Sequence, residues 1–303
     1  MAETTYAMPR ARQRRAMASL VLMVLIWGIN FPIAKSALGV LTPPAFNALR
    51  FPLAALVVLY ALARSGPIPW PAAADRWRVL TLGLLGNALY QQFFIFGLAN
   101  SHAGIASVLL AATPILTTLL SSAAGHERIT GRTWAGVILG FTGLVLVITQ
   151  SASAGGAGGE SRLLGSILML SAALAWAVYT VGSRDLVARY GPVPVTAWTL
   201  WTGAAVIVLI GIPSLLRTPV HSLPPAIWAA IAYAGALSIG LAYLIWYHGV
   251  GVLGNTRTSA FSNLTPVIAL LAAWLSLGER PTGWQLAGSA VVLAGVTITQ
   301  LRR

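Results

Sequence analysis

Aromatic and amide side chains recur at helical spacing inside apolar segments of this sequence. Asn87, Tyr90, Gln91 and Phe94 follow an i, i+3, i+4, i+7 pattern, so a helix places all four on one face. Such polar groups rarely face lipid, because burying an unpaired polar group is costly. A wall of rings and amides suits an uncharged or zwitterionic organic molecule with an apolar side group, and does not suit a bare inorganic ion.

Four other apolar segments carry comparable side chains, and we expect them to line the same cavity. The complete set of candidate binding residues is Trp27, Asn30, Tyr90, Gln91, Phe94, Trp176, Tyr179, Trp201, Tyr243, Trp246 and Tyr247. The alternative for each ring taken singly is that it faces lipid or is tightly packed, since Trp and Tyr are frequent in membrane proteins near the interface. Their occurrence on matching segments favours a shared cavity.

Two basic side chains are candidates for pairing with a substrate carboxylate. Arg50 is the only charged residue well inside an apolar segment, and Lys35 closes the first segment. An isolated charge at the bilayer centre costs roughly 2.5–3.5 kcal/mol on insertion scales. Arg50 therefore either pairs with substrate or extends its long side chain to the membrane surface. No Asp or Glu lies within an apolar segment, where ion-coupled carriers usually hold a carboxylate.

Catalytic and metal chemistry find little support in the residue types. The four histidines are scattered over different segments and links, and the absence of cysteine excludes disulfides and thiolate metal sites. The only lysine, Lys35, lacks the second glycine of a nucleotide-binding P-loop. We therefore expect no enzyme activity, no metal and no cofactor.

The elements that must position these residues are ten apolar segments. The chain is 57% hydrophobic and 8% charged, whereas a soluble protein carries roughly 25% charged residues. A helix needs about 20 apolar residues to cross a bilayer. The sequence predicts an all-α integral membrane protein with ten transmembrane helices, near 17–36, 44–63, 78–98, 102–123, 132–149, 163–183, 194–216, 226–250, 256–276 and 284–301.

The basic residues behind the net charge of +13 indicate how the chain is oriented in the bilayer. With a cytoplasmic N-terminus, fourteen basic residues fall on the inside and four on the outside. This distribution follows the positive-inside rule and predicts that both termini are cytoplasmic. Basic residues gathered at segment ends do not form the basic face of a nucleic-acid-binding protein, so we expect no nucleic-acid partner.

One 24-residue phrase occurs twice in the chain. Residues 113–136 align without a gap to residues 265–288, with nine identities at an offset of 152. Five segments precede the Gly-rich link at 151–159 and five follow it, and an odd number per half inverts the second half. The sequence predicts one membrane domain made of two inverted five-helix repeats, 1–150 and 151–303, with a site at their interface.

The repeated phrase carries Thr-Pro and Glu-Arg pairs. Pro114 and Pro266 fall in the middle of their segments, so each should kink a helix, either as a hinge between conformations or as a static bend. The pairs Glu127-Arg128 and Glu279-Arg280 fall in turns. Thr130 and Thr282 are then expected to cap the next helix, with each Glu near the positive end of that helix.

These motifs resemble those of a known transporter family. The Trp-Gly-x-x-Phe-x-x-x-Lys pattern from Trp27 to Lys35 and the repeated Thr-Pro…Glu-Arg…Gly…Gly pattern resemble the EamA family of the drug/metabolite transporter superfamily. The resemblance covers the whole chain. Within the family, the chain is similar to amino-acid exporters.

The resemblance implies a multi-pass protein of the bacterial inner (cytoplasmic) membrane. We expect it to export small organic metabolites, with aromatic or neutral amino acids as the leading substrates, by alternating access of two halves around a central cavity. The alternatives are export of drugs, nucleosides or organic cations, since aromatic walls also attract cations, and a channel-like facilitator. A membrane enzyme is the rival class that the scattered histidines disfavour.

Overall fold

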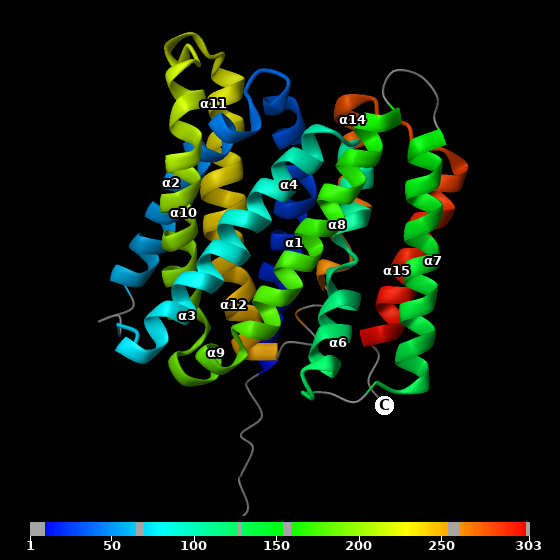
Figure 1. Ribbon diagram of the computed structural model, residues 1–303, viewed down its shortest axis with the longest axis horizontal. Helices are drawn as coiled ribbons and strands as arrows, with labels where there is room; N and C mark the ends of the chain where they lie inside the picture. The colour runs from blue at the N-terminus through cyan, green and yellow to red at the C-terminus, as the bar shows by residue number, and fades with distance from the viewer. Residues whose placement is uncertain are drawn as a thin grey trace, which may run out of the picture.

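The protein is a bundle of helices that run up and down one common direction (Figure 1). The computed structural model describes residues 10–64, 70–126, 129–153, 159–253, 258 and 261–300, and these ranges contain no β-strand. The first part of the chain forms α1 (Arg10–Leu38), α2 (Pro43–Ala63), α3 (Ala73–Gly83), η1 (Leu84–Leu89), α4 (Tyr90–Ala99), α5 (Ala103–Leu110), α6 (Thr113–Ala123) and α7 (Gly131–Ser153). The second part forms α8 (Gly159–Gly182), α9 (Arg184–Tyr190), α10 (Pro192–Leu216), η2 (Val220–Ser222), α11 (Pro225–Ala232), η3 (Tyr233–Leu241), α12 (Ala242–Leu253), α14 (Thr265–Leu277) and α15 (Gly283–Gln300).

Several of these helices have the length and composition of membrane spans. Among the described residues, eight helical stretches are long and apolar enough to cross a membrane, and α14 and α15 are shorter apolar helices. The all-helical, multi-pass character is thus confirmed. The count of ten spans stays a prediction, because helix α14 covers only Thr265–Leu277 of the ninth predicted segment.

The two ends of the bundle can be told apart by the chain termini. The start of α1 and the end of α15 lie at the same end of the bundle, at the bottom of Figure 1. We call this the terminal end and the other the opposite end. The end of α7 and the start of α8 lie at the opposite end.

Two of the predicted spans contain a stretch of π-helix. η1 lies between α3 and α4, and η3 lies between α11 and α12. The 152-residue offset carries residues 84–89 of η1 onto residues 236–241, which lie within η3. A π-helix has wider turns than an α-helix and occurs often at functional sites. Each π-helix is followed at once by a candidate aromatic residue. Tyr90 is the first residue of α4, and Tyr243 is the second residue of α12.

The prolines of the repeated phrase lie at helix starts. The sequence predicted instead that they lie in the middle of continuous helices. The fourth span breaks after α5, and Pro114 occupies the first turn of α6; Pro266 likewise occupies the first turn of α14. Proline fits there because its missing N–H has no helical partner in that turn. The Thr113 hydroxyl donates to the Leu110 carbonyl at 2.7 Å, which is the acceptor that Pro114 leaves free. A hinge role for either proline remains a prediction.

Contacts between the helices repeat at the offsets found in the sequence. A Cβ built on Gly97 of α4 would lie 2.8 Å from the Met169 Sδ of α8, and one on Gly249 of α12 would lie 2.8 Å from a Leu20 methyl of α1. Gly97 and Gly249 differ by 152 positions, and Leu20 and Met169 differ by 149. The two contacts therefore join equivalent positions of the two sequence repeats. This is the relation expected of two halves about a pseudo-two-fold axis.

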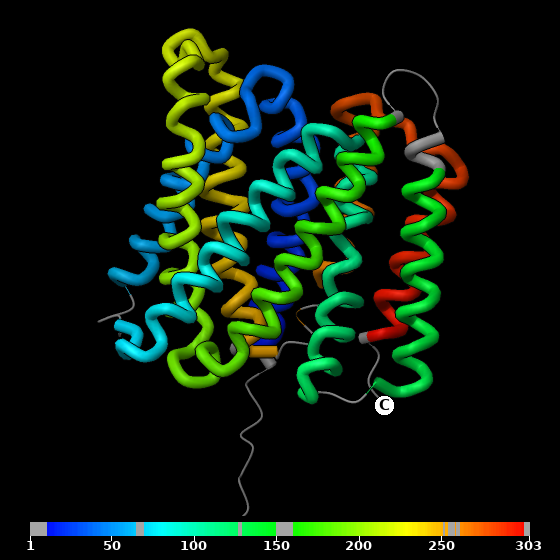
Figure 2. Tube along the Cα trace, in the orientation of Figure 1, coloured from blue at the N-terminus to red at the C-terminus, as the bar shows by residue number. Residues whose placement is uncertain are grey.

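A glycine seam joins the two halves between α7 and α15, which lie side by side in Figure 2. A Cβ on Gly136 would lie 2.8 Å from the Gly295 carbonyl oxygen, and one on Gly143 would lie 2.7 Å from the Gly288 carbonyl oxygen. Each contact is again the image of the other, since 136 maps to 288 and 143 maps to 295. Glycine lets the two backbones touch, and any side chain here would push the helices apart.

The predicted caps are confirmed, but the partner of Glu279 is not the predicted one. The Thr133 N–H donates to the Thr130 Oγ1 at 3.3 Å and the Gln285 N–H donates to the Thr282 Oγ1 at 3.2 Å, so both threonines cap the following helix. Glu279 instead accepts hydrogen bonds at the start of α5, in the other half of the chain. The pair Glu127-Arg128 lies outside the described residues.

Candidate functional site

Six of the predicted aromatic residues come together from four helices, and we call them the aromatic cluster. Its members are Trp27 of α1, Tyr90 of α4, Trp176 and Tyr179 of α8, and Tyr243 and Trp246 of α12. α1 and α4 belong to the first part of the chain, while α8 and α12 belong to the second. The cluster therefore lies between the two parts, where the sequence places the site.

The rings of the cluster form a continuous series of contacts. Trp176 is central, with its ring centroid 4.9 Å from Tyr90, 5.2 Å from Tyr179 and 5.9 Å from Tyr243. Trp27 adds contacts to Tyr243 at 6.4 Å and to Trp246 at 5.7 Å. These separations are typical of attractive aromatic pairs. Tyr179 and Tyr243 are buried, whereas the other four members are half-buried and keep accessible ring surface.

Hydrogen bonds fix two members of the cluster to neighbouring elements. The Trp27 Nε1–H donates to the Ser238 carbonyl of η3 at 2.9 Å, and the Tyr179 hydroxyl lies 3.1 Å from the Thr199 hydroxyl of α10. Gly86 of η1 makes room for the Tyr179 ring, because a Cβ at this position would overlap it. Both π-helical turns thus contribute directly to the placement of the rings.

Three polar side chains lie together beside the aromatic cluster, with Arg50 of α2 at their centre; we call them the polar group. The Arg50 Nε–H donates to the Asn47 Oδ1 at 2.9 Å, and the Nη2–H donates to the Gln91 Oε1 at 2.8 Å. The Asn47 amide donates to the Gln91 carbonyl at 3.3 Å. Arg50 is only 1% exposed, so its side chain does not reach the membrane surface, and that sequence-based alternative was wrong.

Phe94 connects the polar group to the aromatic cluster. The Arg50 Cζ lies 5.7 Å from the centroid of the Phe94 ring, which is itself 6.1 Å from the Tyr90 ring and 5.6 Å from the Phe31 ring. Phe46 and Phe51 also face the guanidinium, at 5.0 and 5.7 Å. Aromatic faces attract a cation and partly replace the water that Arg50 has lost.

The remaining candidate binding residues are Tyr247, Asn30 and Trp201. Tyr247 is half-buried and packs beside Tyr243 in one apolar cluster. Asn30 of α1 is 5% exposed, and its Oδ1 has no hydrogen-bond partner. Trp201 of α10 packs against the apolar clusters that contain Tyr243 and Tyr179. Its Nε1–H donates to the Ala55 carbonyl at 3.4 Å, and it also lines a groove of about 470 Å³ between α2 and α10.

Lys35 and Glu279 occupy the opposite end of the bundle. The Lys35 ammonium donates to the Leu98 and Ala99 carbonyls at 3.0 and 2.7 Å, so it stabilises the last turn of α4. The Glu279 carboxylate accepts from the N–H groups of Ala103 and Gly104 at 2.9 and 3.2 Å, so it stabilises the first turn of α5. Opposite charges thus complement the two helix dipoles of one helical hairpin.

His102 lies in the link between α4 and α5 and faces the same charges. Burial lowers the pKa of His102, and the charges of Arg162 and Lys35 lower it further, while the charge of Glu279 opposes them. His102, Glu279 and Pro281 line a small cavity together with Leu270 of α14. The neutral imidazole is therefore the favoured form at neutral pH.

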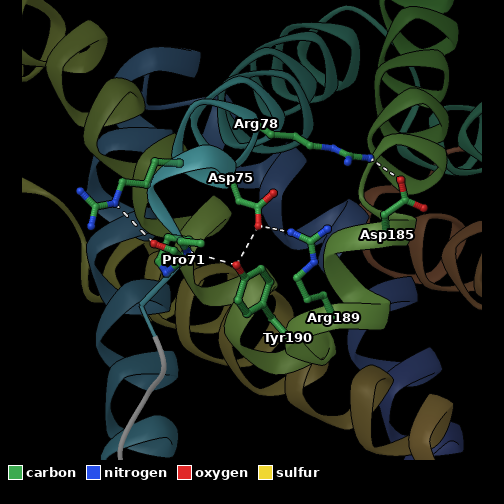
Figure 3. A network of polar contacts seen from close by, with 8 residues as sticks. Pro71, Asp75, Arg78, Asp185, Arg189 and Tyr190 are labelled. Carbon is green, nitrogen blue, oxygen red and sulfur yellow. Dashed lines mark hydrogen bonds and ion pairs between the residues drawn. The ribbon is translucent and has the colours of Figure 1, made fainter.

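At the terminal end, a charged network joins α3 to α9 (Figure 3), and no sequence pattern predicted this pairing. Asp75 of α3 forms an ion pair with Arg189 and accepts a hydrogen bond from the Tyr190 hydroxyl at 2.7 Å. Beside it, the Arg78 Nη2–H donates to the Asp185 Oδ2 at 3.0 Å. Arg78 lowers the pKa of Asp185 through this bond and through its charge. We call these residues the terminal network.

No group of three His, Asp or Glu side chains within the described ranges comes together as a set of metal ligands. The aromatic cluster and the residues beside it offer ring faces, one buried guanidinium and amide groups. Groups of these types are common in pockets that bind organic molecules with an apolar portion.

Comparison with known proteins identifies relatives along the entire chain. The sequence profile of the EamA-like transporter family matches twice, over residues 14–149 and 163–301. A probable terminal-alkyne amino-acid exporter of Streptantibioticus cattleyicolor is 29% identical over 95% of this chain and 94% of its own length. A probable amino-acid metabolite efflux pump of Escherichia coli is 29% identical over 92% of each chain.

Two further comparisons agree with these relatives. An uncharacterized transporter of Archaeoglobus fulgidus is 30% identical over 94% of this chain and 98% of its own length. One solved crystal structure superimposes with a TM-score of 0.65, at 24% identity, over 95% of this chain and 97% of that one. This last likeness supports the fold alone.

Proposed function

Because this chain belongs to the EamA-like transporter family, we propose that it exports small organic metabolites, and aromatic or large neutral amino acids above all. The chain is a multi-pass membrane transporter of a family whose members are not enzymes. The observation that carries the substrate proposal is the aromatic cluster. Six rings from four helices meet between the two parts of the chain, beside one buried guanidinium.

The substrate proposal follows from the surface that the cluster offers. Half-buried Trp and Tyr rings bind flat or branched apolar groups, and their polar edges accept or donate single hydrogen bonds. The relatives named as amino-acid exporters support this substrate class, at 29% identity. Organic cations fit less well, because the nearest charge to the cluster is the positive charge of Arg50.

The transport mechanism that we propose is alternating access of two inverted halves, residues 1–150 and 151–303. The contacts repeated at the 152- and 149-residue offsets support this division, as does the twofold match to the family profile. In this mechanism the helices around the cluster part at one end while the other end stays closed.

The two ends of the bundle differ in their charged contacts. At the terminal end, the Asp75–Arg189 and Arg78–Asp185 pairs tie α3 to α9. The sequence offset places the apolar residues Ile227 and Ala230 at the positions equivalent to Asp75 and Arg78. We infer that opening the terminal end requires the terminal network to separate. Among the described residues, the charged contact between the halves at the opposite end is that of Glu279 with the start of α5.

The orientation that we propose puts the terminal end in the cytoplasm of a bacterial-type cell. The excess of basic residues on the links of this end supports the orientation. Substrate would then enter from the cytoplasm after the terminal network separates. Export of an accumulated metabolite needs no further energy source, since its own concentration gradient drives transport.

A competition panel in vesicles tests the substrate proposal. Purified protein in lipid vesicles would be assayed for uptake of labelled tryptophan against unlabelled amino acids, nucleosides and organic cations. We expect saturable uptake that aromatic and large neutral amino acids inhibit. Inhibition by nucleosides or organic cations alone would replace the substrate class, and linear, unsaturable flux would replace the carrier by a channel-like facilitator.

A further inference from the structure

Arg50 is a buried cation that lacks an ionic partner among the described residues. Among the described residues, it is the largest side chain with an exposure below 2%. Its two hydrogen bonds go to neutral amide oxygens, those of Asn47 and Gln91. Guanidinium groups do not lose their proton in proteins, so the charge persists inside the bundle.

The described carboxylates are all engaged or placed elsewhere. Asp75 pairs with Arg189, Asp185 pairs with Arg78, and Glu279 binds the start of α5. Glu160 is exposed in the first turn of α8. Glu3 and Glu127 lie outside the described residues. A buried charge normally has an ionic or metal partner, because neutral partners replace only part of the lost hydration.

Asn30 presents the complementary feature on α1. Its side chain is 95% buried, and its Oδ1 accepts no hydrogen bond. It lies three positions after Trp27 and next to Phe31, whose ring contacts Phe94. A buried acceptor without a donor is unfavourable, and an ammonium group is a strong donor with no acceptor function.

We propose that Arg50 and Asn30 bind the two charged groups of an α-amino acid, the carboxylate at Arg50 and the ammonium at Asn30. The proposal rests on the proposed export of amino acids and adds the residues that recognise the zwitterion. The side group of the substrate then lies against the aromatic cluster, which Phe94 joins to Arg50. In this proposal, the Arg50 guanidinium alone distinguishes an amino acid from the corresponding amine, which lacks the carboxylate.

Gln91 gives the substrate its access to Arg50. The amide oxygen of Gln91 occupies one side of the guanidinium, where a carboxylate oxygen fits with a stronger, charge-assisted hydrogen bond. A substrate carboxylate therefore displaces this oxygen, and the Gln91 side chain rotates away. Gln91 directly follows Tyr90, so the displacement takes place at the edge of the aromatic cluster.

Binding to the purified full-length protein tests this assignment with three probes. L-tryptophan carries both charged groups, tryptamine lacks the carboxylate, and indole-3-propionate lacks the ammonium. We expect the wild-type protein to bind tryptophan more tightly than either analogue. In Arg50→Gln, the affinity for tryptophan should fall by roughly 10- to 100-fold, whereas the affinity for tryptamine should not fall, because the variant removes a like charge. In Asn30→Ala, the affinity for tryptophan should fall to that of indole-3-propionate.

A second variant keeps the test decisive if Arg50→Gln does not fold. Gln91→Glu places a permanent carboxylate on Arg50, so we expect a higher melting temperature and loss of the preference for tryptophan over tryptamine. A higher melting temperature with the preference intact would make Arg50 purely structural and overturn the proposal. Arg217→Gln, at an exposed position after α10, is the matched control and should change neither quantity.

The outcomes separate this proposal from the proposed function. Equal binding of all three probes by the wild-type protein would overturn the roles of Arg50 and Asn30 and leave export of aromatic compounds in place. Binding of nucleosides or organic cations, with no binding of tryptophan, would overturn both proposals.

Discussion

Trp176 holds the central position among the aromatic residues, since its ring contacts those of Tyr90, Tyr179 and Tyr243. These contacts join α8 to α4 and α12, which come from different parts of the chain. In the proposed site, a ring with this many partners is the central anchor for a ligand. Residues of this kind usually dominate binding energy.

Replacing Trp176 should therefore impair transport more than it impairs folding. We expect Trp176→Ala to lower the initial rate of tryptophan transport by roughly tenfold or more, as for other central aromatic anchors. Trp134→Ala on α7 is the control, because Trp134 is 49% exposed and lies outside the cluster. Uptake into vesicles at matched amounts of folded protein measures both. Equal rates for the two variants would contradict the assignment of the cluster as the site.

His102 gives the protein a pH dependence that can be measured directly. Because burial lowers its pKa in the folded state, protonation favours the unfolded state. The stability that the neutral form provides is complete above the unfolded pKa of about 6.5 and is lost as pH falls below it. We expect the melting temperature in detergent to decline between pH 7 and pH 5, and His102→Gln to make this decline shallower. An unchanged slope in the variant would show that other groups cause it.

The sequence predicted which residues share a helix face better than it predicted which distant residues contact each other. The face that carries Tyr90, Gln91 and Phe94 followed from helical spacing, because spacing is a local property. Trp201 packs against the apolar clusters of Tyr243 and Tyr179, and it also lines a groove between α2 and α10 that composition did not predict. The bond between Glu279 and the start of α5 spans 176 positions, and no local pattern specifies such a pairing.

At the scale of elements, the wide turns of η1 and η3 set the positions of the rings. Each lies at an equivalent place in its half and each touches the other part of the chain, η1 through Gly86 against Tyr179 and η3 through Ser238 against Trp27. Sequence periodicity predicted these spans as continuous α-helices, because a π-helical turn depends on tertiary contacts. The apolar segments themselves, their order and their threonine caps could be predicted from local chemistry alone.

The glycine seam predicts a sharp difference between two Gly→Ala substitutions on α15. A Cβ at Gly295 would overlap the backbone of Gly140, whereas nothing lies within 4 Å of one at Gly283. Overpacking against a backbone costs about 1–3 kcal/mol. We therefore expect Gly295→Ala to lower the melting temperature clearly and Gly283→Ala to leave it unchanged or slightly higher. Thermal unfolding in detergent measures both, and equal effects would contradict the close contact.

Reversing the Arg78–Asp185 pair tests the terminal network. Arg78→Asp and Asp185→Arg each place like charges together, so each should lower the transport rate or the melting temperature. The double variant restores an ion pair and should recover most of the loss. The pair is exposed, so its own contribution is small, and the recovery is the informative quantity. A double variant no better than either single one would show that the pair does not act as a unit.

At the scale of the whole molecule, both described ends of the chain lie at one end of the bundle. The sequence predicted this arrangement from the parity of its spans and the distribution of basic residues. Single cysteines can test it without background, since the sequence has no cysteine. A membrane-impermeant thiol reagent applied to intact cells should label Arg217→Cys and spare Arg64→Cys. Labelling of both, or of Arg64→Cys alone, would refute the orientation.

The seam between α7 and α15 also constrains how the halves can move. The backbones touch along Gly136, Gly143, Gly288 and Gly295, so we expect the proposed movement of the halves to preserve these contacts. A rotation whose axis runs along these two helices keeps their contacts, and its displacement grows with distance from the axis. Spin labels placed on α7 and α15 should therefore keep a constant separation throughout the transport cycle, while labels on α3 and α9 report large changes.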